Sequence, residues 1–245
     1  MIKLKRGQKP SHLTDAYVAQ KTADFKAQGT RVWDDQNIKK ALLKSSNDKC
    51  AFCECKIDEE SKYLEVEHFK YKKQHPDDVL EWENLLPSCK RCNGKKHTHD
   101  VVLEPIINPF IDNPATHIKL HYYRLKYKTT KGKITISTLG LNDTRKVTRK
   151  RFEVGEQLQR NLDMIQDRLE SYKENPITRR KNKLVGCMHD TLQEAMPCEA
   201  YSATVATVLH NDSEYEEIKK ELIRLELWSV ELQNMDRISS DLVLN

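Results

Sequence analysis

The chain of 245 residues has no apolar run long enough to cross a membrane, and no apolar stretch follows its basic first residues. A transmembrane helix needs about 20 predominantly apolar residues, and a signal peptide needs an apolar segment after its positive start. We therefore expect a soluble protein without a secretion signal and without a membrane partner. Glycine is also scarce, at seven residues, which leaves little room for a flexible linker. There is no internal repeat and no low-complexity segment.

Cysteine is the informative residue type. Four of the seven cysteines form two Cys-x2-Cys pairs, Cys50 with Cys53 and Cys89 with Cys92. Two such turns direct four thiolates at one point, so we expect them to hold one structural Zn²⁺. Cys55 is an alternative ligand, although the spacing of Cys53 fits the zinc turn better. Zinc spacing with three cysteines left over suits a reducing compartment, and we expect a cytoplasmic protein.

Between the two pairs lie Glu67 and His68, and Asn93 directly follows the second pair. None of the three is needed to hold zinc. A carboxylate and an amide oxygen are ligands for a hard divalent cation such as Mg²⁺ or Mn²⁺, and a neighbouring imidazole can activate water. One such cation with one base predicts phosphodiester hydrolysis. The alternative is a structural zinc ribbon with an incidental histidine.

The order of these residues resembles the zinc-stapled, McrA-like branch of the HNH (ββα-metal) endonucleases. The resemblance covers about residues 50–100 and is carried by Cys50-x2-Cys53, Glu65-Val66-Glu67-His68-Phe69 and Glu83-Asn84-Leu85-Leu86-Pro87-Ser88-Cys89-x2-Cys92-Asn93-x2-Lys96.

This resemblance implies a role for each matching residue. His68 would be the general base, and Glu67 a metal ligand where the family more often has aspartate. Asn84 would brace the loop and orient His68, and Asn93 would be a second metal ligand. His97 lies at i+4 from Asn93 and would share its helix face, as a third ligand or a phosphate contact.

The net charge of +5 is unevenly distributed. From Asp212 to Asn245 the chain has nine acidic and four basic residues, a net charge of −5, so the preceding chain carries +10. Basic clusters usually mark a solvated helix face, but those beside the motif are expected to bind nucleic-acid phosphates. These candidate phosphate contacts are Lys70, Lys72, Lys73, Lys90, Arg91, Lys95 and Lys96.

A narrower resemblance extends past residue 100, through residues 105–118 and the run Thr138–Asn142. Together with Cys92-Asn93-x2-Lys96 these stretches resemble the PtuB-like HNH proteins of Septu-type and retron-associated anti-phage systems. The resemblance implies a defence effector that works beside an ABC/SMC-type (PtuA-like) ATPase; the retron association also points to a reverse transcriptase and its msDNA. DNA is the favoured substrate and RNA the alternative. Other hypotheses are a stand-alone restriction or homing nuclease, and a catalytically silent zinc-binding nucleic-acid adaptor.

The predicted fold class is α+β and mostly helical: a zinc-stapled ββα-metal module in a helical body with an additional β-hairpin. We expect three segments: an N-terminal helical segment (1–49), the nuclease module (50–110), and a hairpin with C-terminal helices (111–245). Hydrophobic spacing and turn residues predict the following elements. They are helices at 11–29 and 35–47, strands near 57–60 and 63–68, a loop at 70–82, a helix at about 89–96, an extended connector at 104–114, a hairpin of 118–127 with 132–139, a helix from the N-cap at 142–144 to about 173, and helices near 177–190, 197–209 and 213–235.

Overall fold

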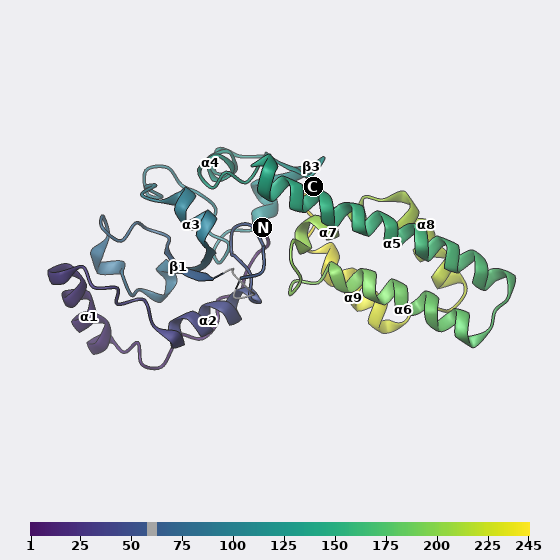
Figure 1. The fold of residues 1–245 in the computed structure, drawn as a ribbon, viewed down its shortest axis with the longest axis horizontal. Helices are drawn as coiled ribbons and strands as arrows, with labels where there is room; N and C mark the ends of the chain where they lie inside the picture. Colours follow the sequence, from purple (N-terminus) through teal and green to yellow (C-terminus); the bar gives the residue numbers. More distant parts are fainter. Residues whose placement is uncertain (58–62) are drawn as a thin grey trace. The chain divides into compact units, whose positions relative to one another are not determined.

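A computed structural model describes residues 1–57 and 63–245 and divides the chain into two compact units (Figure 1). Unit 1 comprises residues 1–118 and 126–142, and unit 2 comprises residues 119–125 and 143–245. The described residues are mostly helical and contain two small two-stranded sheets, which confirms the predicted fold class. The predicted segment boundaries at residues 49 and 110 stay a prediction.

Unit 1 begins with two helices whose ends follow from their capping residues. The helix α1 (Asp15–Gln28) starts where the Thr14 side chain accepts a hydrogen bond from the Tyr17 amide, and it ends at the left-handed Gly29. The helix α2 (Gln36–Ser46) starts at Asp35, whose carboxylate accepts from two amides of the first turn. Such side chains satisfy amide groups that have no partner within the helix. Both predicted helices are confirmed, although each is shorter than its hydrophobic pattern.

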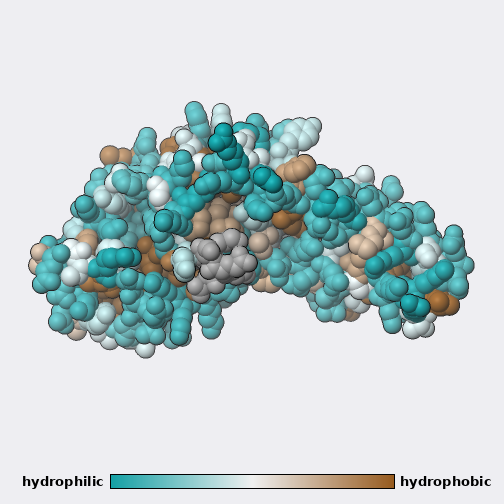
Figure 2. All heavy atoms as spheres, in the orientation of Figure 1, coloured by the Kyte–Doolittle hydropathy of each residue, from teal (hydrophilic) through white to brown (hydrophobic). Residues whose placement is uncertain are grey.

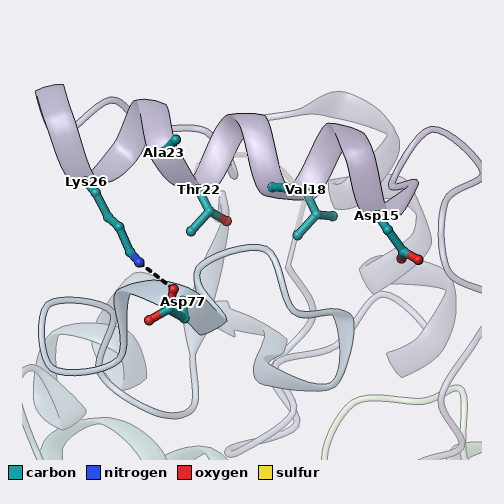
Figure 3. Close-up of a pocket in the computed structure, with 7 residues that line it drawn as sticks. Asp15, Val18, Thr22, Ala23, Lys26 and Asp77 are labelled. Carbon is teal, nitrogen blue, oxygen red and sulfur yellow. Dashed lines mark hydrogen bonds and ion pairs between the residues drawn. The ribbon is translucent and has the colours of Figure 1, made fainter.

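An apolar core packs the N-terminal segment of unit 1 against the strand that ends at His68 and the loop that follows it. The buried side chains of this core come from the segments on either side of α1, from α2, from the first strand, and from the loop and strand that follow it. They are Leu13, Trp33, Ile38, Leu42, Val66, Val79, Leu80, Trp82 and Leu85. On its other side α1 faces the short helix η1 (Pro76–Asp78), where Lys26 forms an ion pair with Asp77 (Figure 3). A cavity of about 410 Å³ lies along this seam.

The centre of unit 1 is a ββα arrangement. The strand β1 (Leu64–His68) pairs antiparallel with β2 (Leu85–Cys89), and the helix α3 (Lys90–Lys96) follows without a loop. The short helix η2 (Trp82–Asn84) leads into β2. The sequence predicted the first strand and the helix but missed β2, because Leu-Leu-Pro-Ser-Cys has no alternation and contains a proline. The predicted partner strand at 57–60 lies outside the described residues except for Ile57, which is not in a strand.

The second predicted hairpin was placed wrongly. The strands β3 (Ile118–His121) and β4 (Arg124–Tyr127) form it, and they turn at Tyr122 and Tyr123, both with positive φ. After the single-turn helix η3 (Pro114–Thr116) and this hairpin, residues Thr130–Thr138 form the helix α4 instead of a strand. Gly132 serves a close approach rather than a turn, since a Cβ there would lie 2.1 Å from the His117 carbonyl oxygen.

Unit 2 contains the tip of the β3–β4 hairpin, residues 119–125, and a helical bundle formed by residues 143–245. The carboxylate of Asp143 caps a π-helical turn, as predicted for that position, and a long helix follows. The elements are η4 (Thr144–Thr148), α5 (Arg149–Glu174), α6 (Thr178–Glu194), α7 (Ser202–His210), α8 (Ser213–Arg224) and α9 (Val230–Ser240). α5 packs against α6, α7 and α8, and α6 runs beside α9 (Figure 1).

The helix α5 buries Leu158, Leu162, Ile165 and Leu169, whereas Phe152 near its start is about half exposed. One prediction for unit 2 needs correction. The single helix expected at 213–235 is two helices, since the segment between α8 and α9 breaks at Glu226, which adopts a positive φ. A new N-cap at Ser229 then starts α9, with its hydroxyl accepting from the Leu232 amide.

None of the helices in the described ranges is long and apolar enough to cross a bilayer. On the face shown in Figure 2, hydrophilic side chains cover most of the surface and apolar ones form small separate groups.

Candidate active site

The four cysteines predicted to bind zinc meet at the start of α3. Cys89 is the last residue of β2 and the N-cap of α3, where its sulfur accepts from the Cys92 amide at 3.5 Å. The turn that carries Cys50 and Cys53 docks on β2 through the Ala51 amide, which donates to the Pro87 carbonyl at 3.0 Å. All four Sγ atoms lie within 4.8 Å of one another.

This cluster fits a zinc ion. Tetrahedral zinc with Zn–S bonds of about 2.3 Å requires sulfurs about 3.8 Å apart. Cys53 Sγ and Cys89 Sγ are separated by 3.8 Å. Cys55 Sγ lies 3.5 Å from Cys53 Sγ but is not one of the four that converge. The geometry is compatible with a zinc site of two Cys-x2-Cys turns.

His68 ends β1 and is almost completely buried. Its ring stands edge-on to Trp33, with the centroids 4.8 Å apart, and its Nε2 lies 3.0 Å from the Val79 carbonyl oxygen. Because a carbonyl can only accept, Nε2 carries the proton and Nδ1 keeps its lone pair. Burial, more than the repulsion from nearby Lys72, lowers the pKa of His68 to about 3, so the ring is neutral at physiological pH.

Asn84 connects the two ends of the loop that follows His68. Its side-chain oxygen accepts from the Lys70 amide at 2.7 Å, and its amide nitrogen donates to the carbonyls of Lys70 and Asp78 at 3.3 and 3.1 Å. The Val79 carbonyl that holds His68 directly follows Asp78 in this loop. Asn84 therefore fixes the segment that orients the imidazole.

Glu67 points to the opposite face of β1, toward α3, and is buried. Its Oε1 lies 2.7 Å from Lys96 Nζ, and the same ammonium donates to the His68 carbonyl at 2.9 Å. Burial raises the pKa of Glu67 to about 7, although Lys96 acts in the other direction. Glu67 therefore precedes His68 on β1 but points away from it, with a lysine as its direct partner, and its role as a metal ligand stays a prediction.

Asn93 meets a second carboxylate on the same face. Its side-chain amide donates to Glu65, which lies two residues before Glu67 on β1. Both residues line a cavity of about 260 Å³. The other residues of its wall are Arg31, Trp33, Asp34, Lys39, Leu64, Val66 and Lys72. Carboxylate and amide oxygens that open on one cavity suit a hard divalent cation, so the donor set fits Mg²⁺ or Mn²⁺.

Three predicted contacts differ from the sequence interpretation. His97 is not on the face of Asn93, because α3 ends at Lys96 and His97 is an exposed cap residue with positive φ. Lys96 is 1% exposed and occupied by Glu67, so it does not present a phosphate contact. Arg91 donates to the Gly140 carbonyl and to Cys92 Sγ, which gives it a structural role in holding α3.

The remaining predicted basic residues stay at the surface. Lys70 pairs with Asp78 at 2.9 Å, and Lys72 lies 4.8 Å above the Trp33 ring on the cavity wall. Lys73, Lys90 and Lys95 are exposed. Sequence reasoning missed Arg31, Trp33 and Lys39 as wall residues, since they precede the motif and only the fold brings them to it.

Comparison with known proteins identifies first the class of this site and then individual relatives of the chain. The family model of the HNH endonucleases matches residues 50–99, the segment that forms the cysteine cluster, β1, β2 and α3. Over 237 residues the chain is 44% identical to the Septu protein PtuB of Bacillus thuringiensis, covering 96% of this chain and 92% of that protein. It is 28% identical over 177 residues to the Septu protein PtuB of Bacillus mycoides (strain KBAB4), covering 58% of each.

The chain belongs to the PtuB family of HNH proteins. This confirms the resemblance stated from the sequence. The HNH domain and the relationship to Septu proteins support a nuclease effector of a Septu-type defence system.

Proposed function

We propose that this chain hydrolyses phosphodiester bonds with a divalent cation, and that it is the nuclease subunit of an anti-phage complex. One observation carries the proposal. His68 uses Nε2 for the Val79 carbonyl and keeps Nδ1 as an acceptor at the end of β1, and on the opposite face of that strand the Glu65 carboxylate meets the Asn93 amide. A neutral imidazole held in one tautomer has a lone pair for a proton from water. A pKa of about 3 makes it a weak base, and an anionic phosphate bound nearby would raise that pKa toward the range in which a general base is effective.

Each residue of the site has a proposed role in this hydrolysis. His68 accepts the proton of the attacking water, and Asn84 holds the loop that fixes its tautomer. Asn93 and Glu67 are the proposed cation ligands, and Glu65, which accepts from Asn93 and lines the cavity with it, is a further oxygen donor. Glu67 uses Oε1 for Lys96, which leaves its other oxygen as the ligand atom. When bound, the cation would stabilise the charge on the phosphate and on the leaving oxygen.

Cysteines 50, 53, 89 and 92 are the proposed ligands of a structural zinc ion. Zinc there would tie the 50–53 turn to the junction of β2 and α3. That junction sets the direction of α3, and so the position of Asn93 relative to β1. Zinc would therefore act on catalysis through position alone.

A specific observation favours a second candidate, the catalytically silent zinc-binding adaptor. The ammonium of Lys96 contacts Glu67 where a cation ligand is proposed, and a lysine there opposes cation binding by charge repulsion. The two candidates differ in one measurement. The nuclease cleaves plasmid DNA or total cellular RNA when Mg²⁺ or Mn²⁺ is added, whereas the adaptor binds nucleic acid and cleaves neither.

The same assay tests substrate and regulation. DNA is the proposed substrate and RNA the alternative, so both are offered in parallel. We expect weak cleavage by the isolated chain and stronger or regulated cleavage with an ABC/SMC-type ATPase partner. A stand-alone restriction or homing nuclease would be fully active without any partner.

The proposed docking surface for the ATPase is the acidic C-terminal pair α8 and α9. Leu225 and Trp228 pack partly against the core of unit 2, so charged residues there would disturb the fold. Ile223 and Val230 are better probes, since they are 50% and 80% exposed. Ile223→Arg with Val230→Arg should abolish co-purification of the co-expressed ATPase while zinc content stays unchanged. A retron reverse transcriptase with its msDNA is the alternative partner to offer in the same experiment.

A further inference from the structure

We propose that the cavity beside β1 and α3 binds the phosphodiester backbone of the substrate, with Arg31, Lys39 and Lys72 as its phosphate-binding side chains. This inference rests on the proposed nuclease function. It adds two residues, Arg31 and Lys39, that lie outside the segment matched by the HNH family. The N-terminal helical segment would then be part of the substrate-binding surface and more than a support for the motif.

The cavity has two chemically different walls. Glu65 and Asn93 form the wall on β1 and α3, where the cation ligands are proposed. Arg31, Lys39 and Lys72 come from the connection between α1 and α2, from α2, and from the loop after β1. A volume of about 260 Å³ is several times the roughly 30 Å³ that one water occupies in the liquid, so the space admits a group larger than water.

The Asp34 carboxylate already contacts two of these three basic side chains, Arg31 and Lys39. The Asp34 carboxylate forms an ion pair with Lys39 and lies 3.6 Å from the Arg31 guanidinium. The hydrogen bond from Lys39 lowers the pKa of Asp34, so Asp34 is ionised and a phosphate would exchange with it for Lys39 and Arg31. A phosphate offers more oxygens and a similar charge, and arginine binds it in a planar, two-point geometry.

The third cation is held by an aromatic ring. Lys72 Nζ lies 4.8 Å from the centroid of Trp33, and no carboxylate is paired with it in the described part of the chain. Burial lowers the pKa of Lys72. The same Trp33 ring packs edge-on against His68, so one residue contacts both Lys72 and the proposed base. The charge of Lys72 also helps to lower the pKa of His68, so a phosphate that neutralised Lys72 would act on the proposed base.

Binding to a labelled duplex tests the proposal without cleavage. Fluorescence anisotropy is measured with the full chain and a short labelled DNA duplex, without added divalent cation. The variant Arg31→Ala with Lys39→Ala is compared with Lys21→Ala with Lys40→Ala. The control pair lies on α1 and α2, removes the same charge and does not line the cavity. Zinc content and thermal unfolding must match the wild type, and Arg31→Lys checks that charge alone restores part of the binding.

We expect the cavity variant to lose about tenfold or more in affinity, and its salt dependence to fall by about two phosphate contacts. The affinity of the control variant should stay within about twofold of the wild type, since it loses only the general electrostatic attraction of two surface charges. Equal losses in both variants, or no binding by the wild type, would overturn the inference. If the cavity variant loses binding while no condition yields cleavage, the cavity inference stands and the nuclease proposal fails. If the wild type cleaves but the cavity variant and the control variant bind alike, the nuclease proposal stands and the cavity inference fails.

Discussion

Lys96 Nζ lies 2.7 Å from Glu67 Oε1, and both side chains are buried beside the proposed base His68. Removing two opposite charges from water is costly, and their attraction offsets that cost only while both are present. Burial holds the pKa of Glu67 at about 7, so its charge depends on its neighbours. The pair therefore couples the stability of the ββα arrangement to the charge state of its site.

Replacing Lys96 by methionine should destabilise unit 1. The change leaves a buried carboxylate without its partner, which typically costs about 3–5 kcal/mol in the free energy of unfolding. Denaturant unfolding of Lys96→Met measures the loss, and Lys95→Met, one residue earlier on the surface, should change it by no more than about 0.5 kcal/mol. The double variant Glu67→Gln with Lys96→Met should recover most of the stability. Similar unfolding curves for the Lys96 and Lys95 variants would contradict a buried pair.

The second prediction separates two histidines of the same segment. His68→Ala removes the proposed base and should reduce cleavage by a factor on the order of 10²–10⁴. His97→Ala changes an exposed residue beyond the end of α3 and should leave cleavage nearly unchanged. Cleavage rates at saturating cation, with zinc content as a check on folding, compare the two. Full activity of a well-folded His68→Ala protein would remove the base assignment.

The sequence predicted those parts of the site whose chemistry is local. Cysteine spacing identified four residues whose sulfurs the fold does bring within 4.8 Å of one another, because each Cys-x2-Cys turn fixes two of them locally. The roles of Glu67 and His68 stay a prediction. The Glu65–Asn93 contact was missed, since the strand register that aligns these residues depends on β2. Lys96 was taken for a surface contact because one helix turn gives no indication of which side becomes buried.

The position of a turn was also hard to predict from the sequence. The predicted hairpin of 118–127 with 132–139 placed its turn just before Gly132, but glycine can serve a close approach as well as a turn, and here it lies against the His117 carbonyl. The true turn uses Tyr122 and Tyr123 with positive φ, a conformation that tyrosine seldom adopts. Only tertiary contacts stabilise such a turn, and Tyr123 lies against Gly155 of α5, where a Cβ would come within 2.2 Å of its ring.

The third prediction concerns zinc. Elemental analysis should find one zinc per chain, and Cys89→Ser should lose it. Structural zinc contributes folding free energy directly, so this variant is expected to be aggregated or protease-sensitive rather than a slower enzyme. Cys55→Ser is the matched control, because its sulfur is close to Cys53 yet outside the cluster of four. Loss of zinc from Cys55→Ser with retention in Cys53→Ser would reassign the ligand.

The fourth prediction is a loss of stability of unit 2 in mild acid. His210 Nε2 bonds to Ser239 Oγ at 2.8 Å, and burial lowers the pKa of this histidine below its ordinary value of 6.5. Asp236 lies 4.0 Å away and opposes this shift, as does Glu216, but Lys219 adds to it. The carboxylate of Asp236 already accepts from Tyr215 and Lys219, so it is not free to stabilise a charged imidazole.

The sign of the effect follows from that lowered pKa. Above pH 6.5 the imidazole is mostly neutral in both the folded and the unfolded chain, so its contribution to stability is fully present. As the pH falls through 6.5 the unfolded chain takes up a proton that the folded chain resists, and the free energy of unfolding decreases. Thermal unfolding between about pH 7.5 and 5 should show this slope in the wild type, and His210→Gln should flatten it. His97→Gln, at an exposed position, should keep the wild-type slope, and equal slopes for His210→Gln and the wild type would assign the acid sensitivity to other groups.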